Sequence, residues 1–519
     1  MRDLSQPVFT FTVDGQSEKT FDVVRFSGEE GLSVLYAFDI LLVSDRDDIN
    51  PADILQSTAH LSILPPFAPE GGLKYTGILA SFQVLHRMGE RYVYAARLQH
   101  KLWWLTLVQQ NRVFVDKTPI EACTQVLNEA DLKGNDFEWK CQKTYKPREF
   151  ICQYGESDFA FFSRWLERLG IYYWFEQTAS GPCCVLADTS MAHTPMKGSE
   201  FCDFTEPSGL NPENPGQVIT DFSLTCPPLP KEVCFKNYNP QKPELDLTCT
   251  AAVSDKGRGT FYRYGDNYST TSEGKELAEV EAQALLSKAN VFSGMSHNPA
   301  LRPGHTFTLR KHFRSAWNQE YLTCTVRHEG SQARLVARTL GTGRDISLSD
   351  SDKLFYRNTF TCIPASTQYR AGRTTPWPRL AGSFPAKIDG EGSAGMAQLD
   401  EQGRYKIVMP FDRAQRGGGK ASCWVRMMQP YAGEGMGFHA PLHKGTEVLI
   451  SFLNGDPDQP VIAGAIPNPA TPSPTTNANA AQINLTSAAG QHFVMDDTPG
   501  SSNILLCSAD KKSFIKITQ

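Results

Sequence analysis

The sequence predicts a mainly β protein with an α/β insert, and two observations carry this prediction. Short segments rich in aromatic and β-branched residues recur along the chain, as in Phe9–Val13 and Leu35–Val43, and such segments are typical of strands. The 519 residues include 33 prolines and 40 glycines, which indicates many turns between short strands. A chain of this length has room for roughly three to four domains.

Strand-like segments form two regions, about 1–110 and about 215–345, and a helix-containing insert separates them at about 115–210. Lys74–His86 and Glu90–His100 look like paired strands of the first region, and Thr306–Arg310 and Tyr321–His328 look like strands of the second. A helix is also expected at 272–290 within the second region. The two regions and the insert together make up a predicted block of residues 1–375.

The clearest helix of the insert is predicted at Ser157–Leu169. Ser157 is a suitable N-cap and Asp158 suits the positive end of the helix dipole. Gly170 can end the helix in the left-handed conformation. A second helix is expected to begin at Thr118-Pro119, a capping residue followed by proline. An apolar stripe at helical spacing predicts core packing, with a cofactor site as the alternative; it consists of Phe159, Phe162, Trp165, Leu166 and Leu169.

The C-terminal part of the chain reads as a second structural region. Residues 364–385 carry four prolines and indicate a connector. Residues 376–469 contain about five short strands, which predicts a small, partly open barrel of the OB type. Within it, Glu447–Leu453 is a buried-looking strand closed by the hairpin signal Asn454-Gly455. Residues 470–482 form a Pro/Ser/Thr/Asn-rich linker.

The last 37 residues, 483–519, offer four very short strands separated by turn residues: Ile483–Leu485, His492–Met495, Asn503–Cys507 and Ser513–Ile517. So few residues cannot bury their apolar faces within one chain. Burial requires neighbouring copies, as in intertwined β-prisms and solenoids. The sequence therefore predicts that the tail assembles with other copies of the chain.

Composition excludes several classes of protein. The net charge of −5 gives the whole chain no electrostatic basis for gripping nucleic acid or an anionic membrane. The N-terminus lacks the apolar segment of a secretory signal, and no apolar run approaches the length of a membrane span. The 13 cysteines include no C-x-x-C pair, which predicts reduced, mostly buried thiols in a protein folded in the cytoplasm.

Several motifs, in a fixed order, resemble the VgrG family of type VI secretion spike proteins, which are related to the hubs and spikes of contractile phage tails. In the first block they are Phe26–Ser33, Leu102–Leu105, Arg112–Phe114 and Gln153–Tyr173. In the small barrel they are Asp400–Val408, Ser422–Arg426 and Gly445–Pro460. The resemblance extends along nearly the whole chain.

The resemblance implies a hub of phage-tail-like β-barrel domains at 1–375, an OB-fold neck at 376–469 and the start of a trimeric β-helical needle at 483–519. It implies a homotrimer that docks on a hexameric Hcp-like tube, carries effectors and a PAAR-repeat tip protein, and contacts baseplate proteins. Membrane contact would be mechanical penetration only. The protein would assemble in the cytoplasm and then reach a target cell or the medium without a signal peptide.

Two departures from the family pattern stand out. The family usually has I-P-R-x-G before its E-V strand, where this chain has Pro441-Leu442-His443-Lys444-Gly445. The family's needle continues for many short strands, whereas this sequence stops at Gln519. The resemblance therefore implies either a truncated chain or a very short needle. No effector domain is expected after residue 483, and no muramidase domain between the neck and the needle.

The sequence predicts no catalytic, cofactor or metal site. It contains no H-E-x-x-H, G-x-S-x-G or Walker motif. His439 and His443 are four apart, but Pro441 between them argues against a helical metal site. The remaining candidates are better explained as loops: the acidic run Asp45, Asp47 and Asp48, the carboxylates Glu391 and Asp400, and the glycines Gly417, Gly418 and Gly419.

Between Arg404 and Arg426 there are six basic residues and one acid, with aromatic residues interleaved. OB folds bind single strands through such features, yet the place of the barrel between a hub and a needle favours no nucleic-acid binding. The predicted function is that of a structural spike that needs no cofactor and is not an enzyme. The alternatives are a baseplate hub or spike of a contractile phage tail or tailocin, and a cell-wall or polysaccharide hydrolase.

Overall fold

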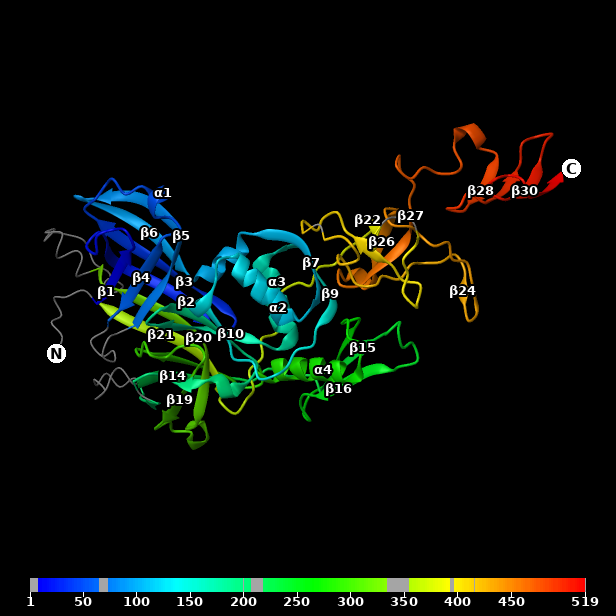
Figure 1. The fold of residues 1–519 in the computed structure, drawn as a ribbon. Helices are drawn as coiled ribbons and strands as arrows, with labels where there is room; N and C mark the ends of the chain where they lie inside the picture. Colours follow the sequence, from blue (N-terminus) through cyan, green and yellow to red (C-terminus); the bar gives the residue numbers. More distant parts are fainter. Residues whose placement is uncertain are drawn as a thin grey trace. The chain divides into compact units, whose positions relative to one another are not determined.

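The structure is a computed structural model that describes residues 8–64, 73–198, 200–206, 218–333, 354–392, 396–414 and 416–518. The chain divides into two compact units (Figure 1). Unit 1 comprises 1–110, 117–147 and 155–377, and unit 2 comprises 111–116, 148–154 and 378–519. The chain thus passes between the units five times rather than once.

Unit 1 is built on one 13-stranded sheet that closes on itself twice. Its first six strands, in the spatial order β1-β4-β5-β6-β3-β2, form a barrel because β1 also pairs with β2. The next six, β20-β21-β18-β14-β13-β19, form a second barrel because β20 also pairs with β19. The two barrels are joined where β2 pairs with β20. The predicted fold class, mainly β with an α/β insert, is confirmed.

The strands of the first barrel are β1 (Phe9–Val13), β2 (Asp22–Gly31), β3 (Val34–Ser44), β4 (Thr58–Ile63), β5 (Leu73–Met88) and β6 (Arg91–Gln99), with a short helix α1 (Pro51–Ile54) between β3 and β4. Those of the second are β13 (Phe201–Phe204), β14 (Val218–Thr225), β18 (Val291–Ser296), β19 (His305–Arg310), β20 (Glu320–Ser331) and β21 (Phe355–Pro364), with β12 (Thr194–Pro195) added beside β19. Alternating buried positions, such as the pattern of β1, fill the barrel interiors.

The insert packs α2 (Pro119–Glu129) and α3 (Asp158–Leu169) with the sheet β10-β11-β8, whose strands are β8 (Phe137–Trp139), β10 (Tyr172–Thr178) and β11 (Gly181–Ala187). The Ser157 side chain accepts a hydrogen bond from the Ala160 amide, as an N-cap does. Gly170 ends the helix at φ 72°, and a Cβ there would lie 2.8 Å from Val280. The predicted helix and both of its ends are confirmed.

The apolar stripe predicted on α3 is only part of what the helix buries. Phe161, Arg164 and Arg168 are also buried, whereas Phe159 and Leu169 are half-buried. Arg164 forms an ion pair of 2.7 Å with Glu156 and stacks over Trp377, 4.1 Å from the ring centroid. The helix therefore lies inside unit 1 on most of its circumference, with its charged side chains paired there.

A small α/β layer completes unit 1. Its sheet, β16-β15-β17, consists of β15 (Glu232–Asn237), β16 (Leu247–Ala252) and β17 (Thr260–Tyr264). Helix α4 (Thr271–Leu286) covers one face of this sheet. The helix ends before the Asn290 expected from the sequence, because Ser287 forms the C-cap. Further turns and short helices are η1 (Lys101–Thr106), η2 (Gly134–Asp136), η3 (Ser190–Ala192) and η5 (Ser315–Trp317).

Unit 2 contains the small barrel expected from the sequence and a separate C-terminal sheet. The barrel has the four-stranded sheet β23-β22-β26-β27, with β22 (Phe384–Asp389), β23 (Lys406–Val408), β26 (Glu447–Phe452) and β27 (Pro460–Ala465), and the hairpin β24 (Ala432–Gly433) and β25 (Met436–Gly437). The hairpin signal Asn454-Gly455 lies in the turn η7 (Leu453–Gly455), where both residues have positive φ. Another short turn, η8 (Asn477–Asn479), lies in the linker.

The barrel core also includes residues from much earlier in the chain. Strands β7 (Gln109–Lys117) and β9 (Arg148–Ser157) pair with each other, and their residues Val113, Phe150 and Cys152 belong to the barrel's core cluster. The Cys152 amide donates a 2.6 Å hydrogen bond to Asp458. The sequence placed residues 111–116 and 148–154 within the block 1–375, whereas their apolar side chains complete the small barrel.

This arrangement makes Val113 a core residue of unit 2, and it is 1% exposed. We expect Val113→Ala to destabilise the barrel by about 2 kcal/mol, because it removes two buried methyl groups and leaves a cavity. Faster labelling of the buried Cys152 thiol by a thiol reagent, read by mass spectrometry, would report the loss. Val108→Ala, at a position 38% exposed in unit 1, is the matched control. Equal labelling of Cys152 in both variants would contradict this role.

All 13 cysteines are free thiols and most are buried. Burial raises the pKa of Cys123 to about 12 and that of Cys324 to about 12, which keeps these thiols protonated at neutral pH. Across the described segments, no helix is both long enough and apolar enough to cross a membrane.

Candidate functional site

The C-terminal sheet has a face composed entirely of apolar side chains. Its antiparallel strands are β28 (Gln482–Thr486), β29 (His492–Asp496), β30 (Asn503–Cys507) and β31 (Phe514–Thr518), orange to red in Figure 1. Residues paired across neighbouring strands share a face of the sheet. The strand register places two complete apolar rows on one face: Ile483, Met495, Ile504 and Ile517, and Leu485, Phe493, Leu506 and Ile515.

The opposite face of the same sheet is mixed and mostly polar. One row is Gln482, Asp496, Asn503 and Thr518, and another contains Asn484 and Lys516. The Gln482 side chain donates a 2.9 Å hydrogen bond to Asp496 along this face. The sheet is therefore amphipathic, and its polar face is suited to water.

The apolar face is uncovered in a single chain. Ile483 is 61% exposed, Leu506 51% and Ile515 63%. A large aliphatic side chain left in water forgoes about 1.5–3 kcal/mol relative to full burial. Seven of the eight side chains in the two rows are between 38% and 63% exposed, and together they forgo an amount comparable to the stability of a small domain. This face is the strongest candidate for a functional surface in the chain.

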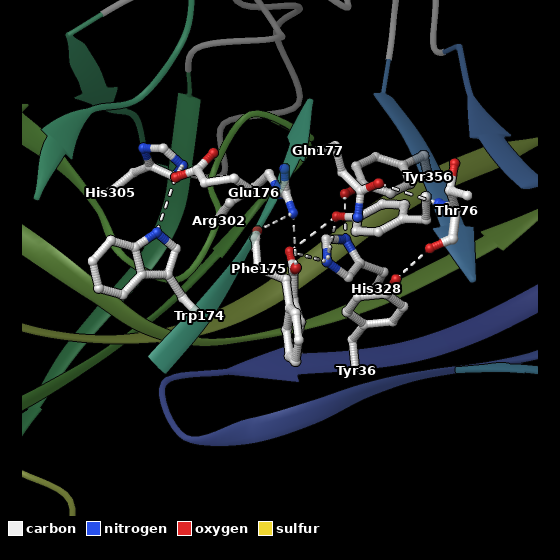
Figure 2. A network of polar contacts seen from close by, with 12 residues as sticks. Tyr36, Thr76, Trp174, Phe175, Glu176, Gln177, Arg302, His305, His328 and Tyr356 are labelled. Atoms are coloured by element: carbon white, nitrogen blue, oxygen red, sulfur yellow. Dashed lines mark hydrogen bonds and ion pairs between the residues drawn. The ribbon is translucent and has the colours of Figure 1, made fainter. Parts of the chain in front are cut away.

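A second candidate is a buried network of charged and aromatic residues where the two barrels of unit 1 meet (Figure 2). Glu30 of β2 is 2% exposed and His328 of β20 is fully buried. One Glu30 oxygen lies 3.2 Å from His328 Nε2 and accepts a 2.9 Å hydrogen bond from the Tyr75 hydroxyl. The other lies 3.4 Å from the guanidinium of Arg302, which also donates a 3.0 Å hydrogen bond to the Phe175 carbonyl.

The network continues in both directions from this ion pair. His328 Nδ1 lies 2.8 Å from the Tyr356 hydroxyl of β21, and Tyr36 of β3 donates to the Thr76 carbonyl. On the other side, Glu176 accepts a 2.9 Å hydrogen bond from the Trp174 indole and lies 3.1 Å from His305 Nε2. Strands of both barrels and of the insert thus contribute to one set of contacts.

Pairing keeps both carboxylates of the network ionised. Burial alone would raise the pKa of Glu30, but the positive charge of Arg302 and the contact with His328 outweigh it and lower that pKa to about 2. For Glu176 the hydrogen bond and charge of His305 likewise overcome burial, so its pKa falls to about 2. Glu30 in turn raises the pKa of Arg302 above its ordinary value.

The network brings together acidic, basic and phenolic groups, as an active site does, but these groups are shielded from solvent. Glu30, Arg302 and His328 are all nine-tenths or more buried, so a substrate could not reach them without opening the barrels. Their contacts connect β2, β20 and the segment before β19. The network therefore fixes the junction of the two barrels.

Acid should weaken unit 1, because the buried His100 and the half-buried His193 are both held neutral in the folded chain. Burial lowers the pKa of His100 to about 3 and that of His193 to about 4. Below pH 6.5 the unfolded chain binds protons that the folded chain does not, so stability falls with pH at about 1.4 kcal/mol per pH unit for each such proton. The depressed pKa values of Glu30 and Glu176 add stability that is present above pH 4.5 and lost towards pH 2.

Urea unfolding of unit 1 between pH 8 and pH 4 checks this expectation. We expect a nearly constant midpoint above pH 7 and a steady decrease below pH 6.5. His193→Gln should make that decrease shallower, because the residue no longer titrates. A midpoint that stays constant down to pH 5 would contradict the prediction.

The residues considered from the sequence as possible metal or catalytic sites mostly make local hydrogen bonds and ion pairs. The two ring nitrogens of His439 lie 2.9 Å from the Tyr405 hydroxyl and 3.2 Å from the Gln429 amide, and His443 lies in the loop before β26. Asp48 and Asp45 pair with arginines, and Asp47 accepts from Tyr92. Within the part of the chain that the structure describes, no three His, Cys, Asp or Glu side chains converge as a metal-ligand set.

The carboxylates, glycines and basic residues near the barrel also have local partners. Asp400 forms a 2.6 Å ion pair with Arg404, Glu391 exchanges hydrogen bonds with Gln398 through its backbone, and the Gly418 and Gly419 amides donate to Asp389. Lys406 donates to the Ser422 carbonyl and lies over the Trp424 ring. Arg416 donates to the Val113 carbonyl. Arg404, Lys406 and Arg416, three of the six basic residues between 404 and 426, are thus engaged in contacts within unit 2.

Sequence reasoning found the apolar tail but missed the buried network. Period-two alternation of apolar residues in short segments is readable from the chain. Glu30 lies 272 residues before Arg302 and 298 before His328, and nothing in their local sequence shows that they meet. The only available signal was their type, because charged residues within strands must be paired if they are buried.

Two closed barrels, a small OB-type barrel and an amphipathic C-terminal sheet define a class of protein, the hub and injector proteins of contractile tails. The profile of the family described as phage tail baseplate hub (GPD) matches residues 29–334, which is more than half of the chain. That of the type VI secretion system/phage-baseplate injector OB domain matches residues 397–466. The chain belongs to the phage tail baseplate hub family, and its resemblance to the VgrG spike proteins is confirmed.

Among similar proteins is the type VI secretion system spike protein VgrG4b of Pseudomonas aeruginosa, 28% identical over 475 residues that cover 91% of this chain and 57% of that protein. The actin cross-linking toxin VgrG1 of Vibrio cholerae is also 28% identical, over 88% of this chain and 41% of its own length. This chain thus spans little more than half of VgrG4b and less than half of the toxin.

A solved structure supports the fold. The E. coli c3393 protein is described as a component of the type VI secretion system with structural similarity to the T4 tail proteins gp27 and gp5. It matches with a TM-score of 0.63 at 22% identity, covering 88% of this chain and 99% of that one. The lidless PdpA-VgrG complex matches with a TM-score of 0.60 at 10% identity, covering 98% of both chains.

Proposed function

We propose that the chain is a structural spike of a contractile injection machine of the type VI secretion kind, and that it acts as a homotrimer. The observation that supports this most directly is the uncovered apolar face of the sheet β28–β31. Three copies of this sheet, placed edge to edge with their apolar rows inward, form a prism with a dry core. The polar row of Gln482 and Asp496 then faces water.

The two barrels of unit 1 suit the rest of this role. Three chains with two similar barrels each supply six barrel positions, which fits a ring that docks on a hexameric, Hcp-like tube. The buried network at the barrel junction would keep those positions rigid under load. The neck and the prism would carry force from this ring to the tip, where a PAAR-repeat protein and effectors are the proposed partners.

No step in this function is catalytic, and we propose that the chain is not an enzyme and needs no cofactor. It would assemble in the cytoplasm and reach the target cell or medium by ejection, contacting membranes only as it penetrates them. The alternative is a hub of a contractile phage tail or tailocin, which would use the same trimeric, force-bearing arrangement. Release of soluble products from peptidoglycan or dye-labelled polysaccharide would instead favour a hydrolase.

Mass measurement in solution tests the proposal. We expect the full chain at micromolar concentration to have the mass of three chains. A chain that ends at Pro469 should assemble more weakly, although unit 1 alone could keep it trimeric. A monomeric mass for the full chain would overturn the proposal.

A further inference from the structure

The hairpin β24–β25 of the small barrel, residues 428–439, is an apolar projection that none of the described residues of its own chain covers. Figure 1 shows the β24 segment standing away from the barrel strands. All residues from 430 to 441 are exposed. Four of the hairpin's residues are large and apolar, and they are about half exposed or more: Met428 62%, Tyr431 56%, Met436 57% and Phe438 48%.

The base of this hairpin is held firmly to the barrel. The Met428 amide donates a 2.8 Å hydrogen bond to the Ile462 carbonyl of β27. At the other end, His439 stacks on the buried ring of Tyr405, with the planes 10° apart. The hydroxyl of Tyr405 also accepts a 3.1 Å hydrogen bond from the Leu442 amide. The barrel therefore presents the hairpin in a defined direction.

Its chemistry is that of a permanent interface. Glu434, at the turn, is the only charged residue between 427 and 438. A two-stranded hairpin is marginally stable by itself in water, and an exposed apolar patch of this kind marks an interaction site. Depletion of charge with enrichment of Tyr, Phe and Met is typical of interface cores, most of all in obligate homo-oligomers.

We propose that the β24–β25 hairpin packs against a neighbouring copy of the same chain and locks the small barrels to one another. This inference rests on the proposed function, because it takes the second copy from the homotrimer. Unit 2 already carries one surface, the apolar face of β28–β31, that requires other copies. A second uncharged apolar surface on the same unit is most simply covered by the same neighbours. In a three-fold ring each hairpin contacts the next chain, and the contacts close without a free end.

Site-specific photo-cross-linking of the full chain tests this inference. The variant Tyr431→p-benzoylphenylalanine is irradiated at micromolar concentration and run on a denaturing gel. A link within one chain leaves the mass of one chain, whereas a link between copies gives bands at the masses of two and three chains. Tyr238→p-benzoylphenylalanine is the matched control, since Tyr238 is a tyrosine of similar exposure, 52%, in unit 1.

We expect Tyr431→p-benzoylphenylalanine to shift much of the protein to two-chain and three-chain bands. Peptide mapping should place the linked position of the neighbour within residues 378–518. The mass of the same variant before irradiation separates the two claims. A three-chain mass with only one-chain bands after irradiation would overturn the hairpin contact and leave the proposed function standing. A one-chain mass would overturn both.

Discussion

The substitution Leu506→Asp is expected to prevent assembly of the C-terminal sheet while both barrels of unit 1 stay folded. Leu506 lies in the middle of an apolar row, between Phe493 and Ile515. In one chain the side chain is half exposed, so the change costs a monomer little. In a three-chain prism it places a carboxylate in a dry core. Each copy then loses about 1.5–3 kcal/mol of apolar burial, and the cost of burying an unpaired charge adds to that loss.

Hydrogen–deuterium exchange over residues 482–518 measures this effect. The parent chain should protect the amides of β29 and β30, and Leu506→Asp should exchange them at the rate of an unfolded segment. The control is Thr486→Asp, which adds the same charge to the opposite, polar face of the sheet and should leave protection nearly unchanged. Equal loss of protection in both variants would contradict the prediction that only the apolar face of the sheet is buried in the assembly.

The apolar face of the C-terminal sheet was predictable because it follows from the alternation of residues within each short strand. Strands of five residues with period-two alternation fix which side chains share a face, as with Ile483 and Leu485, once the strands pair. The same holds for α3, whose N-cap Ser157 and left-handed Gly170 follow from side-chain and backbone chemistry within the segment. Both ends of that helix therefore lie where the sequence predicts them.

The closure of the two barrels was not predictable, because it depends on pairings between distant strands. In the first barrel β1 pairs with β4 and β3 with β6, and in the second β18 pairs with β21 and β13 with β19, although none of these strands follow one another in the chain. The junction of β2 and β20 pairs residues about 300 positions apart, such as Gly28 and His328. Strand composition indicates β structure there but does not specify the partner.

The limits of the small barrel were misplaced for a related reason. Composition marks 376–469 as a compact block, and that block does contain the barrel's four-stranded sheet and the hairpin β24–β25. Val113 and Phe150 occur in a region whose neighbours belong to unit 1. Only packing shows that their apolar side chains fill the barrel core.

Removing Arg302 should cause the largest loss of stability that a single substitution makes in unit 1. In Arg302→Met, Glu30 remains buried without its cation, and the carboxylate must either stay charged in an apolar surrounding or take up a proton. Breaking a buried ion pair from one side costs about 3–5 kcal/mol. The variant also loses the hydrogen bond to the Phe175 carbonyl and the stacking over the Tyr75 ring.

The urea midpoint of unit 1, followed by tryptophan fluorescence, should decrease strongly in Arg302→Met. Arg357→Met is the matched control, because Arg357 pairs with Glu329 on the surface, where the two side chains are 52% and 48% exposed, and such a pair contributes about 0–1 kcal/mol. The double variant Glu30→Gln/Arg302→Met should recover part of the loss, since it removes the unpaired, buried carboxylate as well as the guanidinium. If Arg302→Met and Arg357→Met shift the midpoint equally, the network does not hold the barrel junction. A large loss without recovery in the double variant would assign the effect to packing instead of charge.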